Sequence, residues 1–269
     1  MRVLFCNCSH KAIIPDAVRV PVLAALAAAD DVDLTAVPDL CELVAVRDAR
    51  LAELVAGDAV KIVACFPRAV QGLLHAAGVE LDPARVEILN MRAATADVLL
   101  RRILGDEARP AAATALPDLS VDDTWVPWFP VIDYDRCSTC KQCMSFCPFG
   151  VYELDDAGRV VVANPKNCKN NCPACARICP DVAIMFPKLA DAPINGAPVR
   201  EEDVQRCRAV LDEQAHDLAQ GDIHDVLARR KLKAAYRKLE RLAREQAERE
   251  RAACTDTADK RMDHGTATG

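Results

Sequence analysis

The stretch Cys137-Ser-Thr-Cys140-Lys-Gln-Cys143-Met-Ser-Phe-Cys147-Pro148 decides how the middle of the chain folds. Its spacing, C-x2-C-x2-C-x3-C-P, is the run that binds iron-sulfur clusters in bacterial proteins. Thiolates two residues apart wrap one cluster, because the backbone between them forms a concave loop whose N–H groups face the sulfurs. A second run, Cys168-Lys-Asn-Asn-Cys172-Pro-Ala-Cys175-Ala-Arg-Ile-Cys179-Pro180, repeats the pattern with one extra residue in its first gap.

The two runs predict two [4Fe-4S] clusters within residues 131–190. In this arrangement the fourth cysteine of each run binds the cluster of the other run. The predicted ligands of the first cluster are Cys137, Cys140, Cys143 and Cys179, and those of the second are Cys168, Cys172, Cys175 and Cys147. Zinc is the alternative, but structural zinc takes four ligands from two separated pairs, which these runs fit poorly.

Together with Cys179-Pro-Asp-Val-Ala-Ile184, the runs resemble two-cluster bacterial ferredoxins over residues 137–184. The resemblance implies an α+β ferredoxin-like fold. A hairpin is expected inside it, with strands at Val151–Asp155 and Arg159–Ala163 and a turn at Asp156-Ala157-Gly158. The lengthened gap between Cys168 and Cys172 departs from the family pattern and predicts a shifted potential or a three-iron form for the second cluster.

Residues 1–105 predict a different fold, because short apolar segments alternate with helical ones. Strands are expected at 3–5, 34–37, 61–64 and 86–89, and helices at 16–29, 40–55, 68–77 and 93–104. Glycines lie just past three of these helices, at Gly57, Gly78 and Gly105. This alternation predicts an α/β domain with a parallel, doubly wound sheet.

Four more cysteines follow the strands of this α/β domain. Cys6 and Cys8 come after the first strand, Cys41 after the second, and Cys65 ends the third. The carboxyl ends of parallel strands share one rim, where ligands bind. We therefore expect a third cluster at this rim, with inert buried thiols as the alternative.

The segments Cys6-Asn7-Cys8, Ala64-Cys65-Phe66-Pro67-Arg68 and Leu89-Asn90-Met91-Arg92 resemble the N-terminal domain of the flavin-bearing A subunit of heterodisulfide reductases. The resemblance implies a cluster on the four cysteines. The chain departs from that family at Ser9, where a glycine is usual, and at Phe66, where a serine is usual. Arg68 and Arg92 are predicted to stabilise an anionic cluster, with surface or capping roles as the alternative.

The flavin domain of that family has no counterpart here. The chain contains neither a G-x-G-x-x-G turn nor a P-loop, so we expect no bound FAD, NAD or ATP. A flavin would have to come from a partner subunit.

The remaining segments connect and extend the two domains. Residues 106–130 are a proline-rich linker whose Trp125, Trp128 and Phe129 are expected to cover the core of the next domain. Residues 200–252 form a helical extension with a break at Gly221, and residues 253–269 read as a disordered tail.

Composition sets the class of protein and its compartment. The chain has 269 residues with 14 Cys, a net charge of −6 and 51% hydrophobic residues, which predicts a globular protein that does not bind nucleic acid. Neither a secretory leader nor a membrane span is visible, so a cytoplasmic location and reduced thiols are expected. The predicted function is relay of single electrons to a redox partner protein, such as a flavoprotein or reductase subunit. A subunit of a larger oxidoreductase and a cluster-based redox sensor or scaffold remain as alternatives.

Overall fold

A four-stranded parallel sheet forms the centre of the N-terminal region. The computed structural model describes residues 1–105, 116–122 and 124–220. The strands are ordered β2-β1-β3-β4 and all pairs are parallel. They span β1 Arg2–Cys6, β2 Asp33–Val37, β3 Val60–Ala64 and β4 Val86–Asn90. The sequence predicted each of these strands to within a residue or two, because both faces are covered and each strand is a short apolar run.

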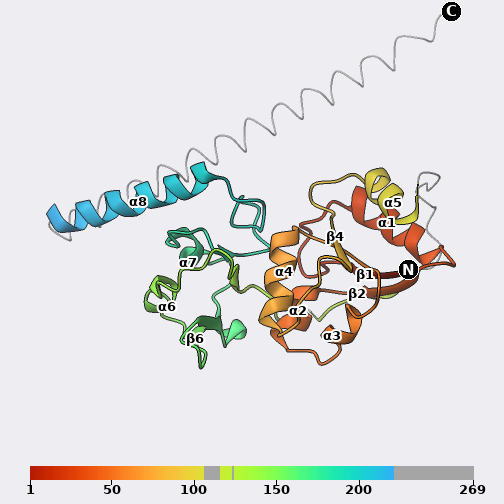
Figure 1. Cartoon of the computed structure of the whole chain (residues 1–269), viewed down its shortest axis with the longest axis horizontal. Coiled ribbons are helices and arrows are strands. Elements are labelled where there is room, and N and C mark those ends of the chain that lie inside the picture. The colour runs from red at the N-terminus through yellow and green to blue at the C-terminus, as the bar shows by residue number, and fades with distance from the viewer. Residues whose placement is uncertain (106–115, 123, 221–269) are drawn as a thin grey trace, which may run out of the picture. The chain divides into compact units, whose positions relative to one another are not determined.

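Helices cover both faces of this sheet (Figure 1). Helices α1 (Asp16–Ala27) and α5 (Ala96–Leu104) pack together on one face. Helices α2 (Leu40–Ala45) and α4 (Pro67–Ala76) pack together on the other. The parallel sheet and its helices confirm the predicted α/β class for this region, and the carboxyl ends of β1, β2 and β3 share one rim.

The single helix predicted at 40–55 is wrong. The segment forms α2 and a separate short helix α3 (Leu51–Leu54). Arg47 has a φ of +53°, which breaks the helical path after Val46. The Asp48 carboxylate then accepts a hydrogen bond from the Arg50 backbone N–H at 2.9 Å and begins the next helix.

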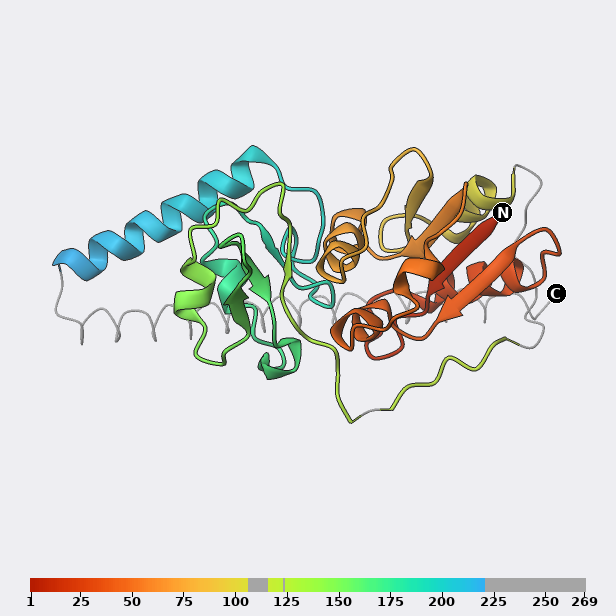
Figure 2. The ribbon, with the colours of Figure 1, turned by 60° about the horizontal axis from the view of Figure 1, so that its bottom comes forward.

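Residues 116–122 and 124–130 run without helix or strand between the two regions (Figure 2). Ser9 Oγ donates to the Leu119 carbonyl at 2.7 Å, which fastens this segment to the rim of the sheet. Trp128 packs in the core of the following region, as expected. Phe129 and Trp125 pack in a second hydrophobic cluster, which joins the core of the sheet to Val131 and Met185 of the cysteine-rich region. Trp125 also lies beneath Lys166, so these two residues contact both regions rather than the following core alone.

The cysteine-rich region is built from small antiparallel pairs. Strand β5 (Val131–Ile132) pairs with β8 (Ile184–Met185), and β6 (Tyr152–Leu154) pairs with β7 (Val160–Val162). The short helices are α6 (Gln142–Phe146), a 3-10 turn η1 (Pro165–Asn167) and α7 (Ala174–Arg177). The β6–β7 pair confirms the predicted hairpin, and its turn is closed by the Asp155 carboxylate, which accepts from the Arg159 N–H at 2.8 Å.

Residues 1–209 form one compact unit in which helix α4 packs directly on strand β5. The approach is so close that a Cβ added at Gly72 would lie 2.8 Å from a methyl carbon of Val131. Gly196 approaches the same helix, and its added Cβ would lie 2.5 Å from the Ala69 side chain. The Arg68 guanidinium pairs with the Asp133 carboxylate at 2.5 Å across this contact.

Helix α8 spans Glu201–Gln220 and forms the start of the predicted helical extension. The rest of that extension, residues 221–252, and the predicted tail at 253–269 lie outside the described residues. Among the helices that the structure describes, none is long and apolar enough to cross a membrane.

Candidate metal centres

The first cysteine run curls around a small cavity. This cavity is lined by Cys137, Cys140, Cys143 and Cys179 together with apolar groups from β5, β7 and β8. Thr139 and Lys141 have φ values of +56° and +62°. Left-handed residues between helical or extended ones turn successive backbone N–H groups toward the same side, which makes a concave loop suited to an anion.

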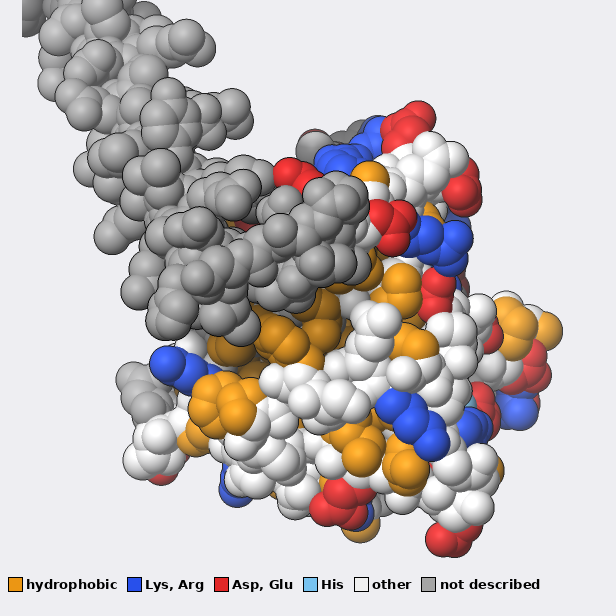
Figure 3. Space-filling view, turned by 90° about the vertical axis from the view of Figure 1, so that its left-hand side faces the viewer, with side chains coloured by type: hydrophobic (Ala, Val, Ile, Leu, Met, Phe, Trp, Pro, Cys, Tyr) orange, Lys and Arg blue, Asp and Glu red, His pale blue; other side chains and the backbone are white. Residues whose placement is uncertain are grey.

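The second run curls around a separate cavity. Its cysteines are Cys168, Cys172, Cys175 and Cys147. Asn171, at φ +59°, lies in the lengthened gap and absorbs the extra residue there. Phe146 and Phe149 border this cavity and are 54% and 41% exposed. Figure 3 shows hydrophobic side chains gathered on the side of the molecule where α6 lies. Each cavity is thus lined by four cysteines drawn from both runs, and their ligation of two clusters in these sets stays a prediction.

The raised pKa values of these thiols are consistent with cysteines that lose their protons only when a cluster binds. Burial raises the pKa of Cys143 to about 11 and the pKa values of Cys168 and Cys175 to about 12. Without a cluster these thiols stay protonated, and ligation must displace the protons. Tyr152 Oη is buried beside the second cavity and lies next to the Cys175 thiol. A buried hydroxyl needs an acceptor, and the thiolate of a ligated Cys175 would provide a charged one.

A single metal ion fits the geometry less well than a cluster. Within residues 1–105, 116–122 and 124–220, no three His, Cys, Asp or Glu side chains gather closely enough to hold one ion. Zinc holds its sulfurs at about 2.3 Å from one point. The thiols instead surround cavities, which is the arrangement that a multi-iron cluster requires.

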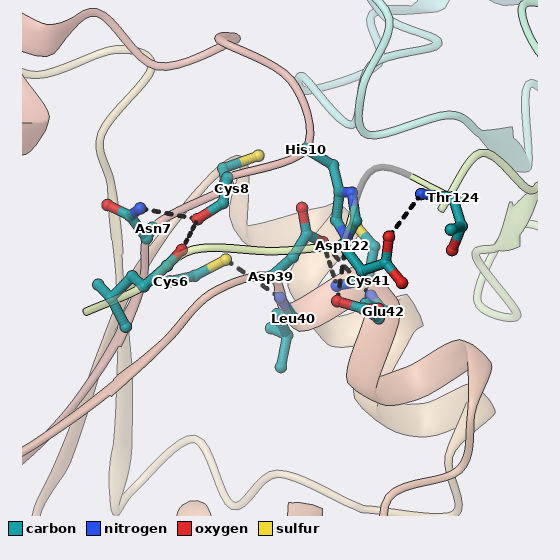
Figure 4. A network of polar contacts seen from close by, with 12 residues as sticks. Cys6, Asn7, Cys8, His10, Asp39, Leu40, Cys41, Glu42, Asp122 and Thr124 are labelled. Atoms are coloured by element: carbon teal, nitrogen blue, oxygen red, sulfur yellow. Dashed lines mark hydrogen bonds and ion pairs between the residues drawn. The ribbon is translucent and has the colours of Figure 1, made fainter. Parts of the chain in front are cut away.

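The four N-terminal cysteines also lie at the rim of the sheet, and Figure 4 shows three of them, Cys6, Cys8 and Cys41. Cys6 ends β1, Cys8 follows it, Cys41 lies in the first turn of α2, and Cys65 follows β3. All four are buried. Cys6 Sγ accepts a hydrogen bond from the Leu40 N–H at 3.3 Å, and Cys8 has the left-handed φ of +54°.

Electrostatics shows how near these four thiols are to one another. Burial raises the pKa of each of these thiols. The neighbouring thiols of Cys8 and Cys65 raise the pKa of Cys6 further, and the same two thiols raise the pKa of Cys41. Burial, followed by Cys8, brings the pKa of Cys65 to about 12. The rim therefore holds four protonated thiols within electrostatic reach of each other, and their ligation of a cluster stays a prediction.

A lysine that the sequence did not single out lies among these thiols. Lys188 is only 2% exposed, its Nζ pairs with the Asp39 carboxylate, and it lies 3.7 Å from Cys8 Sγ. The other Asp39 oxygen accepts from the backbone N–H of Cys41 at 3.0 Å and of Glu42 at 3.3 Å, which caps α2. Nothing in the sequence marked Lys188, because a lone lysine is usually exposed.

The two arginines predicted to stabilise a cluster have different surroundings. The Arg92 guanidinium donates to the carbonyls of Pro187 at 3.0 Å and Leu189 at 3.1 Å, and it interacts with Cys65 and Cys8. Arg68 bonds instead to Asp133 and to the carbonyls of Val182, Pro193 and Ala197. Arg92 thus lies beside the four thiols, whereas Arg68 cross-links α4 to the cysteine-rich region.

An aromatic pair connects the second cavity with the sheet rim. Trp128 Nε1 donates to the Cys172 carbonyl at 3.4 Å, and its ring stacks on Phe186 with centroids 5.4 Å apart. Lys11, close behind Cys8 in the chain, lies over the Trp128 ring at 4.8 Å. Phe186 precedes Lys188 by two residues, so the pair lies between Cys172 and the N-terminal thiols.

Comparison with known proteins places the cysteine-rich region. Residues 129–180 match the family described as the 4Fe-4S dicluster domain. The chain is 38% identical over 76 residues to Ferredoxin-3 of Nostoc sp. strain PCC 7120, a match that covers 22% of this chain and 77% of that protein. The chain belongs to the 4Fe-4S dicluster ferredoxins. This ferredoxin therefore carries [4Fe-4S] clusters, as its cysteine runs predicted.

Two further relatives come from Methanocaldococcus jannaschii. An uncharacterized ferredoxin is 49% identical over 63 residues, which make up 23% of this chain and 42% of that protein. Pyruvate synthase subunit PorD is 34% identical over 61 residues, which make up 23% of this chain and 69% of the subunit. The ferredoxin thus spans less than half the length of the first of these relatives. Each of the two matches covers less than a quarter of the 269 residues of this chain.

Proposed function

We propose that this ferredoxin relays single electrons, as an electron-carrying subunit of a cytoplasmic oxidoreductase complex. The observation that carries the proposal is the pair of cavities, each lined by four cysteines drawn from both runs. Iron-sulfur clusters supply one-electron redox chemistry at a potential set by charge, hydrogen bonds and solvent exposure. The protein's own residues set each of these three quantities.

The proposed ligands follow the cavities. Cys137, Cys140, Cys143 and Cys179 hold the first cluster in a loop that turns N–H groups inward. The second cluster is held by Cys168, Cys172, Cys175 and Cys147. We retain residues 1–105 and 131–190 as two domains joined by residues 106–130, although residues 1–209 form one compact unit.

A third cluster on Cys6, Cys8, Cys41 and Cys65 is part of the proposal. Four buried thiols on one rim, a cation among them and the resemblance to the heterodisulfide reductase A subunit support it. Arg92 supports the site by holding the chain beside Lys188, and Trp128 with Phe186 joins the site to the second cluster.

The proposed partner is a reductase or flavoprotein subunit. PorD is named as a subunit of pyruvate synthase, and it shares the ferredoxin region with this chain. A chain that carries clusters but no recognisable nucleotide motif needs a partner on which substrate chemistry takes place.

Iron and sulfide analysis of anaerobically reconstituted protein tests the proposal. Three cubane clusters correspond to about 12 iron atoms per chain and two to about 8, with equal sulfide. We expect the larger value, and paramagnetic resonance of the reduced protein should show interacting clusters. Stoichiometric zinc without sulfide would contradict the electron-transfer proposal, and a value near 8 would contradict the third cluster alone.

A further inference from the structure

Lys188 brings a positive charge to the N-terminal thiols from outside the sheet region. It follows strand β8, yet its Nζ lies 3.7 Å from Cys8 Sγ, at the end of β1. Lys188 and Asp39 are 2% and 1% exposed. Burying an ammonium is costly unless it is paired, so chains rarely place one in a core without a reason that depends on its charge.

The backbone around Lys188 is held in place independently of its side chain. Arg92 donates to the carbonyls on both sides, those of Pro187 and Leu189, and stacks over the Phe66 ring at 5.0 Å. The Leu189 N–H donates to the Phe186 carbonyl at 2.9 Å. These contacts fix the direction in which the lysine side chain leaves the backbone.

Asp39 orients the ammonium toward the sulfurs. One carboxylate oxygen is used by the N-terminus of α2, and the other binds Nζ. At both Cys8 and Cys41 the electrostatic effect of Lys188 is larger than that of Asp39. The pair is neutral as a whole, but Cys8 and Cys41 are affected mainly by its cation, whereas Cys6 is affected by Asp39.

We propose that Lys188 is a positioning residue that holds a fixed positive charge against the N-terminal cluster and keeps the reduction potential of that cluster high. The inference rests on the proposed third cluster. Reduction adds one electron to a buried site that four thiolates already make anionic, so a nearby cation favours the reduced form. The ferredoxin region thereby completes a site whose ligands all lie in the first 65 residues.

The test is a potentiometric titration of the full chain with Lys188→Met, followed by paramagnetic resonance. We expect the reduction equilibrium of the N-terminal cluster to shift at least tenfold toward the oxidised form, which is 59 mV for one electron. The ferredoxin clusters should keep their potentials. Lys188→Arg keeps the positive charge, so its N-terminal cluster should have a potential close to that of the wild type. Lys169 is an exposed lysine next to Cys168, and Lys169→Met should leave the potential of the N-terminal cluster unchanged.

Removing Lys188 alone leaves Asp39 buried without its partner and can impair folding. The double variant Lys188→Met/Asp39→Asn avoids this, because asparagine still caps a helix. Its N-terminal potential should lie between those of the single variant and the wild type. If the N-terminal cluster keeps the wild-type potential in Lys188→Met or in the double variant, Lys188 does not set that potential. A wild-type chain with about 8 irons and no third signal overturns the third cluster itself, and the iron count thus tells the two failures apart.

Discussion

Cys65 is the residue at which the proposed third cluster is most directly tested, because it is buried and lies at the end of a central strand. Cys65→Ser should remove about 4 irons per chain and leave the signals of the ferredoxin clusters intact. The matched control is Cys207→Ser, since Cys207 Sγ contacts only backbone carbonyls of Arg177 and Cys179. Equal iron content in Cys65→Ser and wild type would show that the rim thiols are only core residues.

Tyr152 offers a second test at the level of one atom. Its hydroxyl is buried next to the Cys175 thiol, and burial, followed by the interaction with Cys175, raises its pKa. A donor aimed at cluster sulfur stabilises the reduced state, so Tyr152→Phe should lower the potential of the second cluster only. Tyr134→Phe is the control, because its hydroxyl already donates to the Val160 carbonyl at 2.9 Å. Unchanged potentials in a redox titration of Tyr152→Phe would show that the hydroxyl faces no cluster.

The cysteines and Arg92 could be singled out from the sequence, and Lys188 and Asp39 could not. Cysteine spacing is a strong local signal, because one loop must reach one cluster with several thiols. Lys188 and Asp39 meet only when β8 and α2 come together in the fold. For Arg68, proximity in sequence to Cys65 suggested a cluster role, whereas its guanidinium bonds to Asp133 across the contact between the two regions.

At the scale of elements, helix α4 packs closely on strand β5. A methyl group at Gly72 would meet Val131 at 2.8 Å and the Ile132 carbonyl at 3.0 Å. Gly72→Ala should therefore reduce the free energy of unfolding by about 1–3 kcal/mol despite the better helix propensity of alanine. Gln71→Ala, on the exposed side of the same helix, serves as the control. Chemical denaturation of both variants measures the difference, and a stabilised Gly72→Ala would mean that the helix and the strand can move apart.

The element boundaries show what periodicity can and cannot predict. Strands β1 to β4 follow from short apolar runs between polar turns. The division of 40–55 into α2 and α3 depends on a left-handed residue at Arg47, which a helical pattern does not reveal. The contacts that Trp125 and Phe129 make with both regions depend on the path of the connecting segment, and hydrophobicity alone does not specify this path.

For the whole molecule, Trp128 and Phe186 predict the order of the relay, with the second cluster next to the N-terminal site. Trp128→Leu removes both the stacked ring and the bond to the Cys172 carbonyl. Electron exchange between these two centres should slow severalfold, while exchange between the two ferredoxin clusters should not. Rapid photochemical reduction followed by spectroscopy measures the rates.

Trp125→Leu provides the control for this rate measurement. Trp125 lies under Lys166 and is not part of the stacked pair of Trp128 and Phe186. Rates that are equal in wild type and Trp128→Leu would place the route between the centres elsewhere.

The burial of Lys188 also fixes an order in time. A ribosome makes the four rim cysteines, Asp39 and Arg92 before Lys188, so the nascent sheet emerges with Asp39 lacking its ammonium partner. The rim reaches its final charge only when the chain beyond β8 has been synthesised and its carbonyls have bound Arg92. If the rim holds the proposed third cluster, iron that arrives before that moment enters a more anionic site than the finished protein presents.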